Sequence, residues 1–232
     1  MNTMELLLTR QSLRSYDDKP IQDDVKRAVL EAMVRGPSAG ALTLYSVLEV
    51  QDQTIKDQLA ESCDHQPFIA KAPWVLIFLA DYQRMVDGWE SLGLQRNRNP
   101  GMGDMLLAVD DALIAAQNAV VAAEAQGLGS CYIGDIMENI ETHVQLLNLP
   151  KYVFPAAMLC IGYPKPGASR SMVPRLPIED LLHQDGYQQR PVSSDAFAEK
   201  QLKRGLEKFN MGFSSEMERS VQAWMKRWMD QQ

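Results

Sequence analysis

DMLLAVDDALIAAQNAVVAAEAQ, residues 104–126, is the stretch of the chain that decides its fold. Ala, Leu and Val occupy most of its circumference at helical spacing, and a helix that is apolar nearly all round belongs in a core. Gly127 and Gly129 follow it, and glycines there end a helix and reverse the chain. The sequence therefore predicts one long buried central helix that the other elements surround.

Four shorter segments around this helix have the patterns of strands. Residues 74–79 form a continuous apolar run opened by Pro73, and residues 156–163 form another, which is typical of strands buried on both faces. Residues 45–50 alternate like a strand, and residues 130–134 are a short strand directly after the central helix. We expect these segments to form one small mixed sheet.

Further helices are expected at residues 4–8, 21–35, 54–62 and 140–149. The first two precede any strand, so the tight strand–helix alternation of a doubly wound fold is missing. We therefore predict an α+β fold of three layers, in which a small mixed sheet carries helices on both faces. The polar residues 82–103 are expected as a loop or lid with some helical character, and the proline-rich residues 164–177 as an extended arm.

The chain divides into a domain over residues 1–190 and a helical C-terminal extension over residues 191–232. Helices are expected in the extension at residues 196–208 and 214–229. The last helix places a stripe of large apolar side chains at helical spacing: Met217, Val221, Trp224 and Trp228. One interpretation is that this stripe docks on the chain's own core. The other is that it wraps around a dimer partner or covers a substrate.

The overall charge is acidic, since 23 Lys and Arg residues against 30 Asp and Glu residues give a formal net charge of −7. An acidic chain without a basic run is a poor candidate for nucleic-acid or anionic-membrane binding. No signal peptide is expected, and no stretch is expected to span a bilayer, because the most hydrophobic piece, residues 74–80, has strand length. The three cysteines are far apart, which predicts reduced thiols in the cytoplasm. The dispersed histidines predict no metal site.

Several common catalytic arrangements are excluded. The Gly127-Leu-Gly-Ser segment follows a helix and opens a strand, which is the reverse of the order around a Rossmann phosphate loop. No Ser or Cys has a His beside it in a motif that would indicate a catalytic nucleophile. Asp110 and Asp111 lie about 100° apart on a helix and cannot work as a paired acid and base. One of them is expected to serve as a polar cap on the buried helix.

A polar cluster near the N-terminus, Arg10-Gln11-Ser12-Leu13-Arg14, has the chemistry of a phosphate site. Arginine supplies a planar, permanently charged fork of donors, and Ser12 adds another donor. The alternative is a solvated basic turn on the surface. Arginines for an anion, small-residue loops and no obvious acid, base or nucleophile together indicate a cofactor that carries the chemistry itself.

The ordered motifs of this chain resemble those of the FMN-dependent nitroreductase/flavin reductase family. RQSLRSY at residues 10–16 and PSAG at residues 37–40 resemble the opening of that family. The similarity runs from about residue 4 to about residue 190 and is closest to the oxygen-insensitive, NADPH-preferring branch. It continues through QPFIAKAP at 66–73, AAQNA at 115–119, GLG at 127–129, YIG at 132–134, GYP at 162–164 and PRLP at 174–177.

The resemblance implies a homodimer with FMN at the interface, with the C-terminal extension packed on the dimer. Arg10, Ser12 and Arg175 would bind the FMN phosphate, and Arg14 would lie by the pyrimidine edge, where a cation stabilises the reduced anion. The implied cofactor-binding residues are Arg10, Gln11, Ser12, Arg14, Pro37, Ser38, Ala39, Gly40, Gln66, Tyr132, Ile133, Gly134, Asp135 and Arg175, with Arg204 for the nucleotide substrate.

The implied activity is a two-step transfer of two electrons. A reduced nicotinamide, NADPH or NADH, passes hydride to the flavin, and a nitroaromatic, quinone, azo compound or flavin then takes the electrons. In the implied site the residue 37–40 loop comes from the partner subunit, Gln66 bonds the ribityl chain or ring edge, and residues 133–135 meet the reactive edge. One alternative is a flavin-binding protein with little reductase activity. Another is a related chemistry such as reductive dehalogenation or flavin destruction.

The chain departs from the family pattern at three places. Val173 stands where many relatives carry Lys, so that Lys165 or Arg170 is a candidate replacement for the lost phosphate contact. Asp135 stands where the close branch has a second Gly, and a carboxylate there disfavours the anionic reduced flavin. After Arg204-Gly205, residues 206–210 replace a basic run that grips the 2′-phosphate of NADPH. The preference between NADPH and NADH therefore stays open.

Overall fold

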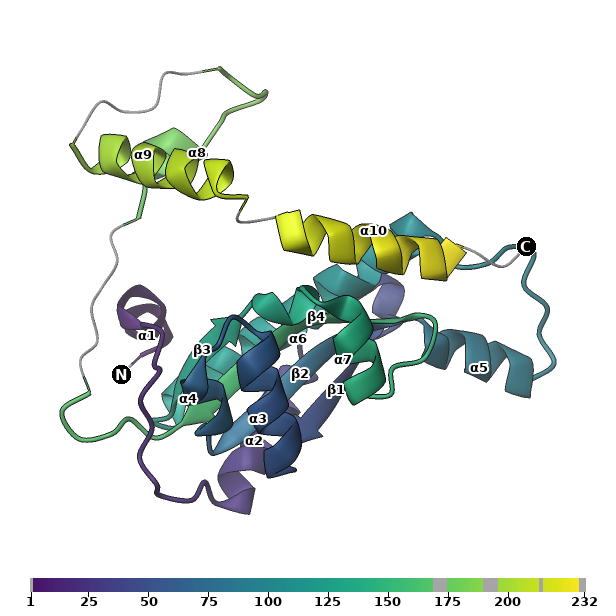
Figure 1. Ribbon diagram of the computed structural model, residues 1–232, viewed down its shortest axis with the longest axis horizontal. Helices are drawn as coiled ribbons and strands as arrows, with labels where there is room; N and C mark the ends of the chain where they lie inside the picture. Colours follow the sequence, from purple (N-terminus) through teal and green to yellow (C-terminus); the bar gives the residue numbers. More distant parts are fainter. Residues whose placement is uncertain (1, 169–174, 190–195, 213–214, 230–232) are drawn as a thin grey trace.

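The structure is a computed structural model that describes residues 2–168, 175–189, 196–212 and 215–229 (Figure 1). The predicted helices and strands are present in the predicted order with small shifts of their ends, and further helices that were not predicted lie between them. The elements are α1 (Thr3–Thr9), α2 (Asp23–Met33), η1 (Ala39–Ala41), β1 (Tyr45–Val50), α3 (Gln53–Ser62), α4 (Pro67–Ala70), β2 (Trp74–Asp81), α5 (Gln83–Ser91), α6 (Met102–Ala125), β3 (Gly129–Ile133), η2 (Asp135–Met137), α7 (Ile140–Leu146), β4 (Val153–Gly162), α8 (Ile178–Leu181), α9 (Ala196–Asn210) and α10 (Ser215–Met229).

The sheet has the strand order β1-β2-β4-β3, and each described pair of neighbours is antiparallel. The prediction of a mixed sheet is therefore wrong for the described strands. Alternating strands and helices do not fix strand direction, because a helical connection can return the chain to either end of the sheet. β4 begins at Val153, three residues before the predicted strand at residues 156–163. Pro155 does not end the strand, because a register shift opposite Phe78 and Leu79 accommodates it.

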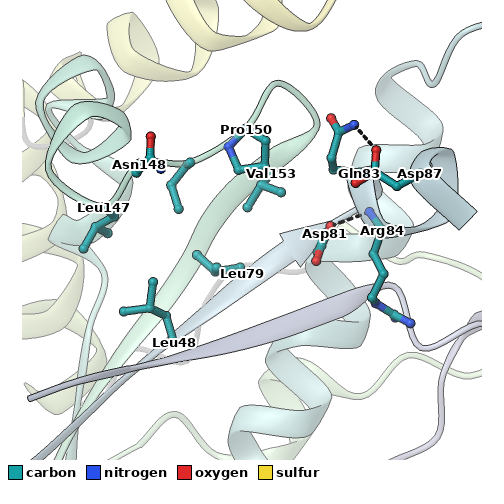
Figure 2. Close-up of a pocket in the computed structure, with 11 residues that line it drawn as sticks. Leu48, Leu79, Asp81, Gln83, Arg84, Asp87, Leu147, Asn148, Pro150 and Val153 are labelled. Atoms are coloured by element: carbon teal, nitrogen blue, oxygen red, sulfur yellow. Dashed lines mark hydrogen bonds between the residues drawn. The ribbon is translucent and has the colours of Figure 1, made fainter.

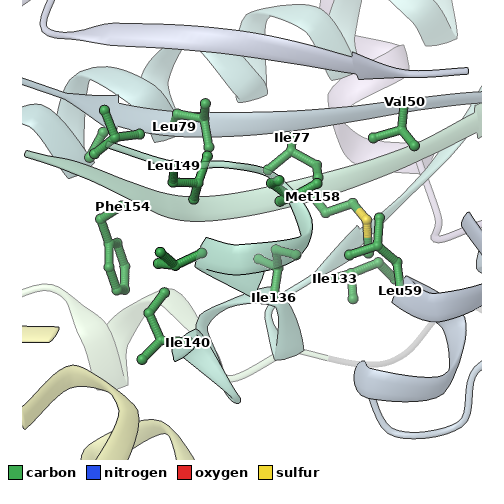
Figure 3. Close-up of a cluster of buried hydrophobic side chains, with 14 of the residues drawn as sticks. Val50, Leu59, Ile77, Leu79, Ile133, Ile136, Ile140, Leu149, Phe154 and Met158 are labelled. Carbon is green, nitrogen blue, oxygen red and sulfur yellow. The ribbon is translucent and has the colours of Figure 1, made fainter. Parts of the chain in front are cut away.

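Two hydrophobic cores lie on opposite faces of the sheet, which confirms the three layers. In β2, Val75, Ile77 and Leu79 face the layer of α3, α7 and α10, whereas Trp74 and Phe78 face α2 and α6. Figure 3 shows the first core, in which Ile77 and Leu79 of β2 and Met158 of β4 belong to one cluster with Ile136 of η2 and Ile140 of α7. β2 and β4 are buried along their whole length, as the continuous apolar runs predicted.

The central helix α6 is not buried all round. Its alanine-rich face packs on β2 and β4, and Gly127 follows the helix in the left-handed conformation (φ +78°), as expected for a residue that ends a helix. The opposite face exposes Leu106, Leu107, Leu113 and Ile114, with exposed fractions of 57, 47, 39 and 37%. An outer layer of a single chain has only one covered side, so this stripe needs another partner to be buried.

Judged only by length and composition, α6 (Met102–Ala125) is long and apolar enough to cross a membrane, so the expectation that no stretch has these properties is wrong. In this structure 44% of its most apolar 18-residue segment is buried. Its contacts with the sheet are those of a core helix, and Asp111 is buried at 2% exposure within it, bonded to backbone amides.

The C-terminal helix α10 docks on the chain's own core, the first of the two interpretations. Trp224 Nε1 donates to Val153 O (3.2 Å) and Trp228 Nε1 donates to Pro100 O (2.9 Å). The Trp224 and Trp228 rings pack edge-to-face on Phe154 and Tyr152, each with ring centroids 5.0 Å apart. Helices α8 and α9 lie apart from the sheet in Figure 1. Val173 and Arg170 are outside the described residues.

Candidate functional site

The predicted phosphate cluster follows α1 and runs along the β3 edge of the sheet. Leu13 is buried and its N–H donates to Ser130 O (2.8 Å) of β3. The Tyr16 hydroxyl lies 2.8 Å from Leu13 O and 3.1 Å from Cys160 O. Burial raises the pKa of Tyr16, so the hydroxyl keeps its proton as a donor. These contacts fix the backbone on which the two arginines stand.

The arginine side chains converge on β3. Burial raises the pKa of the Cys131 thiol, and hydrogen bonds from Ser12 and Arg14, with the positive charge of Arg14 and Arg10, act against that rise. Burial likewise raises the pKa of Tyr132 to about 12, opposed by Arg10. The Arg14 guanidinium carbon also lies 5.8 Å from the centre of the Phe68 ring on α4.

Three buried polar atoms in and beside this cluster have no hydrogen-bond partner among the described residues. Arg10 Nε and Gln11 Oε1 are buried without a hydrogen bond, and so is Ser130 Oγ. Within the part of the chain that the structure describes, neither Arg10 nor Arg14 forms an ion pair with a carboxylate. A buried donor without a partner costs free energy unless a ligand satisfies it. An anionic group such as the phosphate of FMN fits here, whereas a solvated turn would leave Arg10 Nε in water.

A second part of the predicted site is assembled between α4 and η2. Gln66 Nε2 donates to Asp135 Oδ2 (2.8 Å) and to Cys63 O (2.9 Å). The unforeseen short helix α4 begins directly after Gln66, and Gly134 is exposed between β3 and η2. Ile133 itself is buried as the last residue of β3, so only its backbone can face a ligand.

The Pro37–Gly40 loop is built by a carboxylate that the sequence did not assign to it. Asp111 Oδ1 accepts from Ala39 N (2.8 Å) and Asp111 Oδ2 accepts from Leu44 N (2.9 Å). The expectation that Asp111 or its neighbour caps the helix is therefore wrong, because Asp104 caps α6 at Gly101 N (2.8 Å). A buried acid on an apolar helix was the available signal for this role.

The Arg10–Arg14 cluster and the Pro37–Gly40 loop lie at opposite corners of the sheet of one chain. Leu44, next to the loop, enters β1 and accepts from Asp81 N (2.9 Å) at the last residue of β2. Arg10–Arg14 lies along β3, whose first residue pairs with Gly162 near the other end of β2. β1 and β3 are the two edges of the sheet, and Figure 1 shows β3, α1 and α4 on the left and α5 on the right. One chain alone does not bring the two groups together.

The remaining predicted residues are exposed. Arg175 lies on the surface of the described arm. Arg204 lies on α9 and lines a hollow of about 620 Å³ together with Lys200, Lys203, Glu199 and Glu207. A separate groove of about 390 Å³ contains none of the predicted residues; Figure 2 shows its apolar floor and a polar rim that includes Arg84 and Asp87.

A family model described as the nitroreductase family matches residues 7–163. The chain belongs to the nitroreductase family. The oxygen-insensitive NADPH nitroreductase of Salmonella typhimurium is 34% identical over 187 residues, 80% of this chain and 75% of that protein. An FMN reductase (NAD(P)H) of Bacillus subtilis is 36% identical over 182 residues, 78% of this chain and 72% of that protein.

Solved nitroreductase-family structures have the same fold. The NADPH:FMN oxidoreductase from Vibrio harveyi, complexed with NAD+, superimposes with a TM-score of 0.77 at 26% identity, over 89% of this chain and 85% of that chain. The family resemblance and the three-layer fold are thereby confirmed.

Proposed function

We propose that the chain is an FMN-dependent NAD(P)H oxidoreductase that moves two electrons from NADPH or NADH to a small acceptor such as a nitroaromatic, a quinone or a flavin. The observation that carries this proposal is the cluster at β3, where Arg10 Nε is buried without a partner and no carboxylate neutralises Arg10 or Arg14 among the described ion pairs. The printed activities of the nitroreductase and FMN reductase relatives support it.

The residues of the chain bind and orient. Arg10, with Ser12 and the exposed Arg175, would hold the phosphate, because guanidinium forks match phosphate oxygens. Arg14, stacked by Phe68, would lie by the pyrimidine edge and stabilise negative charge on the reduced ring. FMN, when bound, supplies the two-electron chemistry, so the chain needs no acid–base pair of its own. Arg204 and Lys200, beside Glu207 and the Lys203–Glu199 ion pair, would offer positive charge for a nucleotide phosphate.

A homodimer completes this site. The exposed stripe of α6 continues toward β3 through Gln117, whose Oε1 accepts from the Tyr132 hydroxyl at 3.4 Å. In a two-fold dimer the same stripe of both copies would meet, and crossed copies of α6 would direct the Asp111-held loop of one subunit toward the Tyr132 corner of the other. The proposal therefore places one FMN at each of two equivalent interface sites. The three buried free cysteines fit a reducing compartment such as the cytoplasm.

A flavin-binding protein with little reductase activity is the second candidate. Asp135 favours it, because a half-buried carboxylate bonded to Gln66 opposes added negative charge on a nearby reduced ring.

Flavin binding and rapid reduction test the two candidates together. The purified protein is expected to be yellow and to release FMN on denaturation. Stopped-flow mixing with NADPH or NADH is expected to bleach the bound flavin rapidly, and a quinone or nitrofuran to restore its colour. Yellow protein that does not bleach would establish the second candidate. Colourless protein that fails to take up added FMN would contradict both.

A further inference from the structure

The side chain of Gln66 is held by two acceptors at once. Its amide nitrogen lies 2.9 Å from Cys63 O and 2.8 Å from Asp135 Oδ2. A carbonyl oxygen and an ionised carboxylate only accept, so each takes one of the two amide hydrogens. Gln66 has no side-chain donor left. Its Oε1 atom is therefore the one polar side-chain atom that it can offer to a ligand.

The backbone fixes both ends of the Gln66–Asp135 contact. Gln66 N donates to Ala60 O (2.8 Å), and Gln66 O accepts from Ile69 N (3.0 Å) at the start of α4. Asp135 opens η2, and its carbonyl accepts from Glu138 N (3.0 Å). A hydrogen bond to a charged group between two fixed backbones is stronger than a neutral one and holds one geometry.

The candidate site is electrostatically polarised. Arg10 and Arg14 supply positive charge at Cys131, whereas the opposite end is acidic. Burial raises the pKa of Glu138, and the Asp135 carboxylate adds to that rise, as do Glu216 and Asp64. Among the described ion pairs no cation joins Asp135. Its negative charge therefore acts on the site without a neutralising neighbour.

We propose that Asp135 fixes Gln66 as a hydrogen-bond acceptor toward bound FMN and weakens the affinity of the site for reduced FMN relative to oxidised FMN. The inference rests on the proposed function. An acceptor at Gln66 selects an N–H of the ring or a ribityl hydroxyl as its partner. The Asp135 charge opposes the negative charge that the ring gains on reduction, so Asp135 holds the midpoint potential of the flavin low.

The midpoint potential of bound FMN tests this, because equilibrium reduction against a reference dye needs no turnover. Asp135→Asn keeps an oxygen that accepts from Gln66 and removes the charge. The variant is expected to bind reduced FMN about tenfold tighter relative to oxidised FMN, a rise of about 30 mV for a two-electron couple. The shift in a Gln66→Met background isolates the part that the charge exerts without the hydrogen bond.

Asp64→Asn is the matched control, since Asp64 is an exposed neighbour of the same acidic group and makes no described contact with Gln66. It is expected to move the potential by less than half of the Asp135→Asn shift, because water screens an exposed charge. Equal potentials in wild type and Asp135→Asn would overturn the inference while leaving FMN binding intact. Equal shifts in the two variants would also overturn it, since a general acidic field would then suffice. Wild-type protein that binds no FMN would overturn the proposed function with it.

Discussion

The two corners of the sheet that share the predicted FMN site are built in opposite ways. At the β3 corner, Arg10 and Gln11 leave buried polar atoms without partners, and the chain supplies no carboxylate for the arginines among its described ion pairs. At the β1 corner, Asp111 satisfies Ala39 N and Leu44 N, and the Gly40 backbone adopts the left-handed region (φ +56°), which favours glycine. The β3 corner therefore offers unsatisfied polar atoms to a ligand, whereas at the β1 corner Asp111 holds the loop in place through bonds within the chain.

The largest effect on FMN binding is expected from disrupting the proposed dimer, because the β3 corner of one copy and the β1 corner of the other would then no longer meet. Leu113 is 39% exposed on the α6 stripe, and Leu113→Glu would place an unpaired charge in the proposed interface. The variant is expected to run as a monomer in sedimentation and to lose FMN from both sites. Leu92→Glu, at the exposed end of α5, is the control and is expected to remain a dimer with FMN. A yellow Leu113→Glu monomer would show that one chain builds the site alone.

The second-largest effect is expected from removing Arg10, which forms no ion pair among the described residues. Arg10→Ala is expected to weaken FMN binding about 100-fold, because a buried charge-assisted contact is worth several kcal/mol. Fluorescence quenching on titration of apoprotein with FMN measures the loss. Arg27→Ala removes an exposed arginine that pairs with Glu31 and is expected to leave the affinity unchanged. Equal FMN affinities of Arg10→Ala and wild type would contradict the phosphate site and support the alternative that the N-terminal cluster is a solvated surface turn.

A substitution at the β1 corner is expected to lower the free energy of unfolding. Asp111→Asn turns an amide nitrogen toward one of two backbone donors, so the free energy of unfolding is expected to fall by about 2–3 kcal/mol. The neighbouring Asp110 is exposed, and Asp110→Asn is expected to change stability by less than about 0.5 kcal/mol. Urea unfolding of the two variants gives the comparison. Similar curves for both would mean that Asp111 does not hold the loop.

The smallest effect concerns the support of η2 at the β3 corner. His143 is fully buried, with Nδ1 2.9 Å from Ile136 O and Nε2 2.8 Å from Ser62 Oγ, and burial lowers its pKa. As pH falls below the unfolded value of about 6.5, the unfolded chain takes up the proton first, so stability present above that pH is lost.

Thermal unfolding between pH 7 and pH 5 measures this loss, which is expected to be at most about 1.4 kcal/mol per pH unit for one group. His143→Gln is expected to flatten the pH dependence of the free energy of unfolding. An unchanged pH dependence of stability in His143→Gln would contradict the prediction that protonation of His143 in the unfolded chain causes the loss.

Much of the fold follows from local sequence patterns. The runs in β2 and β4, the Trp stripe of α10 and the glycine after α6 are all visible in the sequence, because burial and helix ends depend on neighbouring residues. Strand direction was not visible, since it depends on where each connection returns. The exposed stripe of α6 was hidden for a similar reason, because apolar residues look alike whether the same chain or a second copy covers them.

The candidate site was predictable as residue types but not as contacts. The pairing of Gln66 with Asp135, 69 residues apart, and the Asp111 anchor of the Pro37–Gly40 loop both depend on tertiary geometry. The division of the predicted residues between two corners is likewise a property of the sheet order. Sequence motifs record which residues a ligand needs and do not record which copy of the chain supplies them.

A mixed dimer tests most directly whether the site is shared. A chain carrying Arg10→Ala and a differently tagged chain carrying Asp111→Asn are co-expressed, and the heterodimer is purified through both tags. Each parent homodimer has a defect at both sites, whereas the heterodimer has both defects at one site and none at the other. The shared-site account predicts about one tightly bound FMN per heterodimer and close to wild-type affinity at that site. A heterodimer that binds FMN no better than its parents would contradict it.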